Sequence, residues 1–191
     1  DDIYKKPSFT VDMLIFTVMD KEKENYRKLP EKALKVLLVK RGDHPYIGKW
    51  ALPGGFVGIE ESLDEAALRV LEAETGIEDI YMEQLYTWGE VSRDPRTRVV
   101  SSSYMALVDS KSLNITAGED ETDASWFNVN YDILEEKKMS VENGYIYEQL
   151  VEIKLWNEVE TLSAKIKTTE NLEGKIKREL IENEGLAFDH G

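Results

Sequence analysis

A chain of 191 residues, of which 41% are apolar and 32% charged, is long enough to bury one sizeable core and has the composition of an ordinary globular protein. It contains no cysteine, which excludes disulfide bonds and thiolate metal sites, and no apolar run approaches the roughly 20 residues of a membrane span. Its formal net charge of −14 argues against nucleic-acid binding by this chain alone, because such binding neutralises phosphates with Lys and Arg. With no secretory leader recognisable, we expect a cytoplasmic protein that does not enter a membrane.

The sequence predicts strands on both sides of a single long helix. Short runs rich in β-branched and apolar residues, bounded by polar connectors, are typical of strands. Such runs occupy residues 10–18, 34–39, 82–88, 99–108 and 126–129. This alternation predicts an α+β fold with layers packed around a mixed sheet.

The helix is predicted over residues 63–75. Ser62 and Glu65 have the spacing of a capping box, and Gly76 stands where a helix ends with a left-handed residue. The residues between these signals are apolar at helical spacing, so one face should pack on the body of the protein. The Pro-Gly-Gly sequence at residues 53–55 predicts a tight turn ahead of the helix.

The pattern changes in residues 145–184. Apolar and charged residues alternate there in three runs that are separated by turn-prone clusters, which predicts a three-stranded antiparallel meander. Residues 146–156 are also good helix formers, so a helix is the alternative for that run. A small isolated sheet is marginal in water, so four residues of the meander should pack on another surface. These residues are Tyr145, Tyr147, Leu155 and Trp156.

Residues 55–77 resemble the Nudix box, a pattern written G-x5-E-x7-R-E-U-x-E-E-x-G-U, with U a bulky aliphatic residue. The matching positions are Gly55, Glu61, Arg69, Leu71, Glu74, Gly76 and Ile77. Val70 and Ala73 depart from the pattern, which has glutamates at both places. The resemblance implies the Nudix fold, an α/β/α sandwich with a mixed central sheet. The chain length predicts a single domain over residues 1–191, in which the meander at 145–184 looks like an insertion.

The flanking sequences narrow the resemblance. Residues 40–57, 88–107, 117–127 and 186–190 are similar to the branch of ADP-ribose pyrophosphatases and Nudix-related transcriptional regulators of NAD metabolism. Those regulators carry a DNA-binding winged helix after the Nudix domain. We therefore expect a chain that stops at Gly191 to be a shortened protein or one without that module. Members of this branch are commonly dimers, which implies a homodimer.

The two departures from the box bear on metal binding. Pyrophosphate hydrolysis in this family requires a divalent metal such as magnesium, which is held by glutamates on one helix face and activates water. Positions 70, 73 and 74 share a helix face and here present an isopropyl group, a methyl group and one carboxylate. The resemblance therefore implies weak or absent magnesium binding, at Gly55 and Glu74.

The resemblance also assigns catalytic positions to Glu61, Arg69 and Glu74, with Arg69 orienting Glu61. The alternative is that Arg69 belongs to a solvated charge ladder with Glu65 and Glu72. An acidic loop at residues 119–123 is a further candidate for a catalytic carboxylate, and a solvated loop is the alternative there.

Arginines and the glycine turn are the candidates for ligand binding. Guanidinium groups suit phosphate and ribose oxygens, and three of them lie within residues 93–98 of a strongly acidic chain. Neutralisation of that loop by surrounding acids is the alternative. Trp50 and Trp88 would suit stacking on adenine, although a buried aromatic residue is the default. The full set of candidates is Arg41, Gly54, Gly55, Arg93, Arg96 and Arg98.

The leading hypothesis is a domain that recognises a nucleoside diphosphate linked to another moiety, of the ADP-ribose type, with weak or absent pyrophosphate hydrolysis. One alternative is an active magnesium-dependent pyrophosphohydrolase that recruits ligands such as Glu61, Glu74 and the acidic loop. Another is the ligand-sensing part of a transcriptional regulator that lacks its DNA-binding module here.

Overall fold

The computed structural model describes residues 6–20, 32–78, 80–109 and 121–187. The chain groups into two compact units, which divide between Trp126 and Phe127. In the part that is described, no helix is long and apolar enough to cross a membrane. The organisation of residues 1–191 as a single domain stays a prediction.

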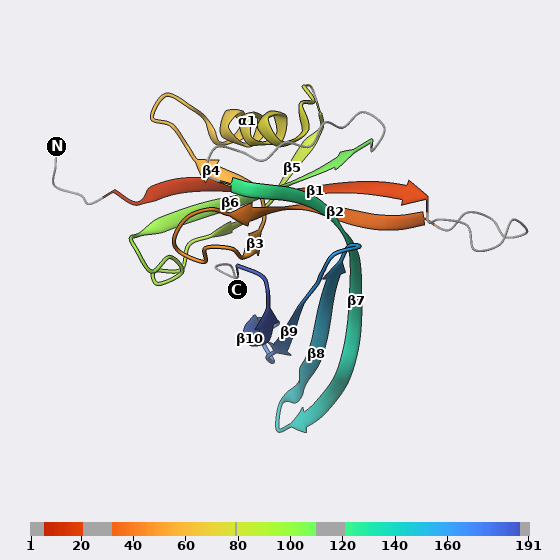
Figure 1. Cartoon of the computed structure of the whole chain (residues 1–191). Helices are drawn as coiled ribbons and strands as arrows, with labels where there is room; N and C mark the ends of the chain where they lie inside the picture. The colour runs from red at the N-terminus through yellow and green to blue at the C-terminus, as the bar shows by residue number, and fades with distance from the viewer. Residues whose placement is uncertain (1–5, 21–31, 79, 110–120, 188–191) are drawn as a thin grey trace, which may run out of the picture. The chain divides into compact units, whose positions relative to one another are not determined.

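The first unit is built on a mixed sheet. Its strands are β1 (Ser8–Asp20), β2 (Lys32–Arg41), β3 (Trp50–Ala51), β4 (Gly54–Phe56), β5 (Met82–Trp88) and β6 (Val99–Val108). One edge of β1 pairs in parallel with β6, and its other edge pairs antiparallel with β4 and then with β2 (Figure 1). β5 pairs antiparallel with β6, and β3 with β2. These directions bring the starts of β1 and β6 and the ends of β2 and β5 to the same end of the sheet.

The helix α1 (Leu63–Thr75) has the bounds that the sequence predicts. The Ser62 hydroxyl accepts a hydrogen bond from the Glu65 amide, and the Glu65 carboxylate accepts one from the Ser62 amide. Gly76 ends the helix with a φ of 68°, which suits glycine. α1 lies across one face of the sheet (Figure 1), where both contribute to a buried core. This core consists of Val11, Met13, Ile15, Leu37, Ala66, Ala67, Val70, Leu71, Tyr104, Ala106 and Val108.

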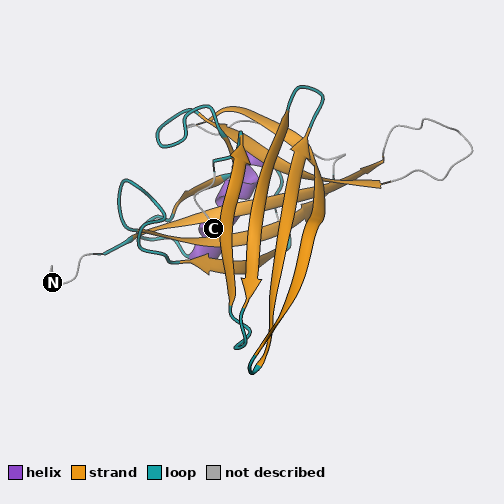
Figure 2. Cartoon of the chain, turned by 90° about the horizontal axis from the view of Figure 1, so that it is seen from below, coloured by secondary structure: helices purple, strands orange, loops and turns teal. Residues whose placement is uncertain are grey.

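The second unit is an antiparallel meander. Its strands are β7 (Glu121–Val141), β8 (Gly144–Trp156), β9 (Thr161–Glu170) and β10 (Ile176–Glu184). β7 begins in the first unit and continues into the second, where it pairs with β8. β9 pairs with β8 and then with β10, so the long strands lie side by side (Figure 2).

The two faces of the meander differ in polarity. Cross-strand pairs on one face are apolar, and its buried members are Val151, Leu155, Leu162 and Ala164. The other face carries cross-strand ion pairs, in which Lys167 lies 2.9 Å from Glu148 and Lys165 lies 2.7 Å from Glu182. Such exposed pairs contribute about 1 kcal/mol at most, so apolar contact is the main source of stability.

Residues 145–184 hold three antiparallel strands, β8, β9 and β10, at the place that the sequence predicts. A fourth strand joins them, because β7 extends far beyond the predicted run at residues 126–129. Its later part lacks an alternating pattern and becomes a strand through pairing with β8. The helical alternative for residues 146–156 is wrong, since they belong to β8. Of the residues expected to pack on another surface, Leu155 is buried, whereas the rings of Tyr145, Tyr147 and Trp156 are exposed.

Candidate functional site

The glycine turn at residues 53–55 lies between β1 and α1, and its backbone comes very close to the backbone of β1. β4 pairs with β1 so that Gly54 faces Asp12 and Gly55 faces Val11. A Cβ atom on Gly54 would lie 2.7 Å from Asp12 Oδ1 and 2.8 Å from the Val11 carbonyl oxygen. A Cβ atom on Gly55 would instead make an ordinary contact, 3.4 Å from Val70 of α1. Only glycine fits at position 54, while position 55 faces the helix.

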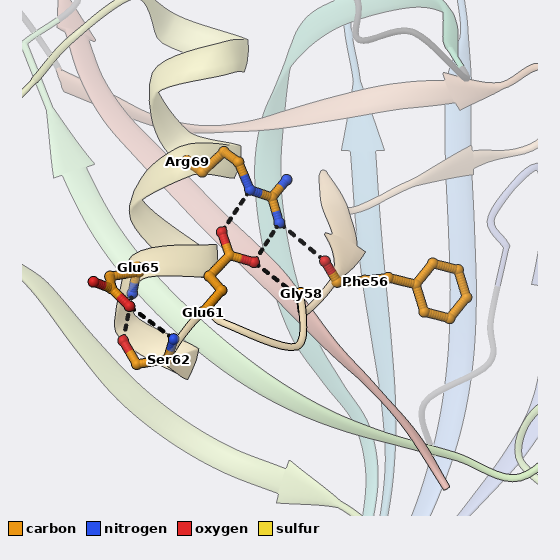
Figure 3. A network of polar contacts seen from close by, with 6 residues as sticks. All are labelled: Phe56, Gly58, Glu61, Ser62, Glu65 and Arg69. Carbon is orange, nitrogen blue, oxygen red and sulfur yellow. Dashed lines mark hydrogen bonds and ion pairs between the residues drawn. The ribbon is translucent and has the colours of Figure 1, made fainter.

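Glu61 and Arg69 fasten the loop after this turn to the helix (Figure 3). Arg69 Nε donates to Glu61 Oε1 at 2.7 Å, and Arg69 Nη2 donates to Glu61 Oε2 at 2.9 Å. The same Nη2 donates to the Phe56 carbonyl oxygen at 2.9 Å, and the Gly58 amide donates to Glu61 Oε2 at 2.9 Å. One guanidinium group therefore holds together β4, the following loop and α1.

This bonding fixes the charge state of the pair. Hydrogen bonds from Arg69 and then from the Gly58 amide lower the pKa of Glu61 from 4.5 to about 2. The bond to Glu61 in turn raises the pKa of Arg69. A carboxylate with so low a pKa is a poor base near neutral pH. Glu61 thus orders the loop, and its catalytic role stays a prediction. Arg69 pairs with Glu61, while Glu65, which the charge-ladder alternative also included, is exposed and caps α1 through Ser62.

A second contact fixes the start of α1 on the sheet. The Tyr104 hydroxyl of β6 donates a 2.6 Å hydrogen bond to Asp64 Oδ1, in the first turn of the helix. Burial, followed by this bond to a carboxylate, raises the pKa of Tyr104 to about 12. Tyr104 sits in the core beneath α1, so the tether acts on the helix that carries the box residues. Sequence reasoning missed this contact, because no local pattern links two residues so far apart.

The helix face expected to hold magnesium is a poor match for that ion. Val70 is 5% exposed and packs in the core, and Ala73 is exposed. Glu74 is only 3% exposed, so its carboxylate is turned away from solvent. Among the residues that the structure describes, no three His, Asp or Glu side chains gather as a metal would require. Magnesium takes several hard oxygen ligands, which these residues do not supply together.

The acidic loop is described only in part. Glu119 and Asp120 lie outside the described residues, as does the side chain of Glu121. Asp123 is an exposed residue of β7, and its carboxylate accepts a 2.9 Å hydrogen bond from the Ala124 amide.

The candidate arginines lie in two loops at the same end of the sheet. In the loop after β5, Arg96 is paired with Asp94 at 2.9 Å, and its Nη1 donates to the His44 carbonyl oxygen at 3.2 Å. His44 belongs to the loop after β2. Arg41, the last residue of β2, donates from Nε to the Pro45 carbonyl oxygen of this loop at 2.9 Å. Arg96 thereby joins the two loops. The structure brings the Arg41 and Arg96 segments together, as a shared site would require.

Arg98 and Arg93 contribute to the structure of the loop after β5 more clearly than to a ligand site. Arg98 donates to the carbonyl oxygens of Gly89 at 2.8 Å and Glu90 at 2.9 Å, which closes the loop on itself. Arg93 is partly buried. Trp50 is buried, with the Lys40 ammonium 5.1 Å from its ring centroid.

The NUDIX domain model matches residues 14–150, which is more than half of the chain. The chain belongs to the Nudix family. Two relatives are similar to this Nudix chain. The ADPR responsive transcriptional repressor NtrR of Acinetobacter baylyi is 39% identical over 110 residues, 56% of this chain and 40% of the relative. The ADP-ribose pyrophosphatase of Methanocaldococcus jannaschii is 34% identical over 128 residues, 67% of this chain and 66% of the relative. The chain therefore spans less than two thirds of either relative.

Solved structures agree with the Nudix assignment. A MutT/nudix family protein from Enterococcus faecalis matches with a TM-score of 0.64 and 31% identity, over 98% of this chain and 59% of that chain. The NUDIX domain of Shewanella oneidensis NrtR, solved in complex with ADP ribose, matches with a TM-score of 0.50 and 37% identity. That match covers 64% of this chain and 73% of the other. The mixed sheet with α1 has the Nudix fold, as predicted, and the resemblance to the ADP-ribose branch is confirmed.

Proposed function

We propose that this Nudix chain binds a nucleoside diphosphate linked to another moiety, of the ADP-ribose type, and hydrolyses it weakly or not at all. The observation that carries the proposal is the state of the box helix. The parts that shape the turn are intact, namely Gly54, Gly55 and the Glu61–Arg69 pair. The carboxylates that would hold magnesium are reduced to one, Glu74, which is buried.

The energetics of the two activities differ. Loss of metal-held carboxylates weakens stabilisation of the transition state, and each ~1.4 kcal/mol lost lowers the rate tenfold. Ligand binding draws on other groups and survives the loss. The joined loops of Arg41 and Arg96 supply guanidinium groups suited to a pyrophosphate. The similarity to the ADPR responsive repressor NtrR and to the ADP-ribose pyrophosphatase supports that choice of ligand.

Isothermal titration calorimetry tests the binding step. Wild-type protein should release or absorb heat with ADP-ribose to a similar extent with and without magnesium. Arg96→Ala should weaken binding about tenfold or more, because a charge-assisted contact to phosphate is lost. Arg178→Ala, which removes an exposed arginine of β10, is the matched control and should leave binding unchanged. No measurable heat with the wild type in either condition would refute the proposal.

A second candidate function is active pyrophosphate hydrolysis, favoured by the similarity to the M. jannaschii ADP-ribose pyrophosphatase. Glu61 is poorly suited to recruitment as a metal ligand, because Arg69 and Gly58 already bond both of its oxygens. A phosphate-release assay over dinucleotides and sugar nucleotides separates the two functions. Turnover at ordinary enzyme rates that disappears in Glu74→Gln would establish the hydrolase.

We further propose that the chain is a homodimer and, following its similarity to the NtrR repressor, the ligand-sensing part of a regulator. The exposed rings of Tyr145, Tyr147 and Trp156 support a role for the meander in association. Native mass spectrometry should give twice the 21.9 kDa chain mass, and a strictly monomeric spectrum would contradict the dimer. The chain alone should not retard duplex DNA at physiological salt.

A further inference from the structure

Tyr86 and Trp88 form an aromatic pair at the end of β5. Their ring centroids lie 4.7 Å apart with an interplanar angle of 64°, an edge-to-face arrangement. The Trp88 indole Nε1 donates a 2.8 Å hydrogen bond to Ser103 Oγ, which fixes the indole on β6. Tyr86 is 60% exposed, so its ring is held by Trp88 without being covered. Burial does not explain why an aromatic residue occupies position 86.

A bulge in β5 directs this pair away from the helix. Before the bulge, Met82 pairs with Ala106 and Gln84 with Tyr104, and both partners belong to the core beneath α1. The register then shifts at Leu85. Tyr86 and Trp88 consequently pair with Ser103 and Ser101, which alternate with Tyr104 along β6 and so face away from α1. Bulges that re-aim a side chain are over-represented next to active sites.

The pair also lies at the end of the sheet that carries the arginine loops. Gly89 follows Trp88 directly, and its carbonyl oxygen accepts a 2.8 Å hydrogen bond from Arg98 Nη2. The loop that begins there contains Arg96, which joins it to the loop of Arg41 through His44. An exposed aromatic ring therefore lies at the same end of the sheet as the guanidinium groups that suit a pyrophosphate. A nucleotide presents this same combination, a flat base beside charged phosphates.

We propose that the nucleobase of the ligand stacks on Tyr86, with Trp88 as the residue that positions the Tyr86 ring. This inference rests on the proposed function and names the part of the ligand that β5 recognises. Stacking suits any base, because every base has a π-face, and truncation of a stacking residue to alanine typically costs about 1–3 kcal/mol. Tyr86 should thus supply affinity for the nucleoside moiety and little for ribose or phosphate alone.

Calorimetry with three probes tests the inference. The probes are ADP-ribose, AMP and ribose 5-phosphate, the last of which has no base. Tyr86→Ala should weaken the binding of ADP-ribose and of AMP about tenfold or more, and should leave the binding of ribose 5-phosphate unchanged. Tyr86→Phe, which keeps the ring, should bind all three like the wild type. Tyr81→Ala is the matched control, because Tyr81 precedes β5 and is 80% exposed. It should leave binding of all three probes unchanged.

The outcomes separate this inference from the function on which it rests. If wild-type protein binds ADP-ribose and Tyr86→Ala binds it equally well, the base does not stack on Tyr86 and the inference fails alone. If Tyr86→Ala weakens the binding of ribose 5-phosphate as much as that of AMP, Tyr86 affects binding through the conformation of the loop. That result also overturns the inference. If the wild type binds none of the probes, the proposed function fails and the inference with it. Thermal melting of each variant shows whether it is folded.

Discussion

Arg69 and Glu61 meet through two parallel hydrogen bonds of 2.7 and 2.9 Å, and Arg69 Nη2 also reaches the Phe56 carbonyl oxygen (Figure 3). A guanidinium and a carboxylate in this geometry form a strong and directional contact. The pair is partly exposed, so its main effect is to order the loop between β4 and α1 rather than to stabilise the whole fold. Four predictions concern this pair and the contacts around it.

Replacement of Glu61 by Gln should change the pH dependence of melting. The pKa of Glu61 is lowered from 4.5 to about 2 by Arg69 and Gly58. A carboxylate with a lowered pKa contributes stability that is complete above pH 4.5 and is lost as the pH falls through about 2. The melting temperatures of wild type and Glu61→Gln should differ most near neutral pH and converge toward pH 2. Glu60→Gln, at an exposed neighbour, is the control, and a difference independent of pH would contradict the assignment.

Gly54→Ala should destabilise the protein more than Gly55→Ala. The new Cβ atom at position 54 would lie 2.8 Å from the Val11 carbonyl oxygen, and the backbone must shift to make room. Overpacking of this kind typically costs about 1–3 kcal/mol. At position 55 the closest atom is a Val70 methyl group at 3.4 Å, which is an ordinary contact. Urea denaturation of the two variants measures the difference, and equal midpoints would refute the close approach.

Tyr104→Phe should loosen the start of α1 without creating a cavity. A hydrogen bond to a charged group contributes about 1.5–3 kcal/mol, so the free energy of unfolding should fall by roughly that amount. Because the pKa of Tyr104 is raised from 10.0 to about 12, its contribution is complete below pH 10 and is lost as the pH rises through about 12. The difference in ultraviolet titration between wild type and variant should show one tyrosine ionising near pH 12. A midpoint near 10 would contradict the tether.

Restoring the box glutamates should produce metal-dependent hydrolysis at a cost in stability. Ala73→Glu adds an exposed carboxylate and should be tolerated. Val70→Glu places a charge in the core, which costs several kcal/mol unless a metal pairs with it. The double variant should melt lower than the wild type, recover on addition of magnesium, and release phosphate at least tenfold faster. Val70→Gln/Ala73→Gln is the matched control, and activity in that control would contradict a carboxylate requirement.

Local signals were enough to predict much of the first unit. The Ser62–Glu65 box and Gly76 place both ends of α1, because a helix end is decided by the few residues that satisfy its free backbone groups. The apolar spacing on the helix likewise predicts its buried face. Short apolar runs predicted the strands at 82–88 and 99–108 with the bounds that the structure has, and those at 10–18 and 34–39, which extend further at both ends.

Contacts between distant residues were beyond the reach of sequence. Residues 130–141 form a strand only because β8 pairs with them, and their own composition does not indicate one. The distant partners of Arg96 and Arg98 are backbone carbonyl oxygens, which any sequence supplies, although Arg96 also pairs with the nearby Asp94. The sequence did not predict the burial of Glu74 either, because the box pattern leads one to expect an exposed carboxylate.

The bulge at Leu85 makes the face on which the aromatic pair lies depend on strand register as well as on residue identity. If Leu85 paired regularly with Ser103, Tyr86 and Trp88 would lie opposite Ser102 and Val100 and turn toward α1, with neither side chain altered. Changes that abolish the bulge without removing a residue would therefore act as an all-or-none change in base recognition, whereas substitutions of the ring would alter affinity by degrees. Relatives that keep both aromatic residues and lack the bulge would make the sharpest natural comparison.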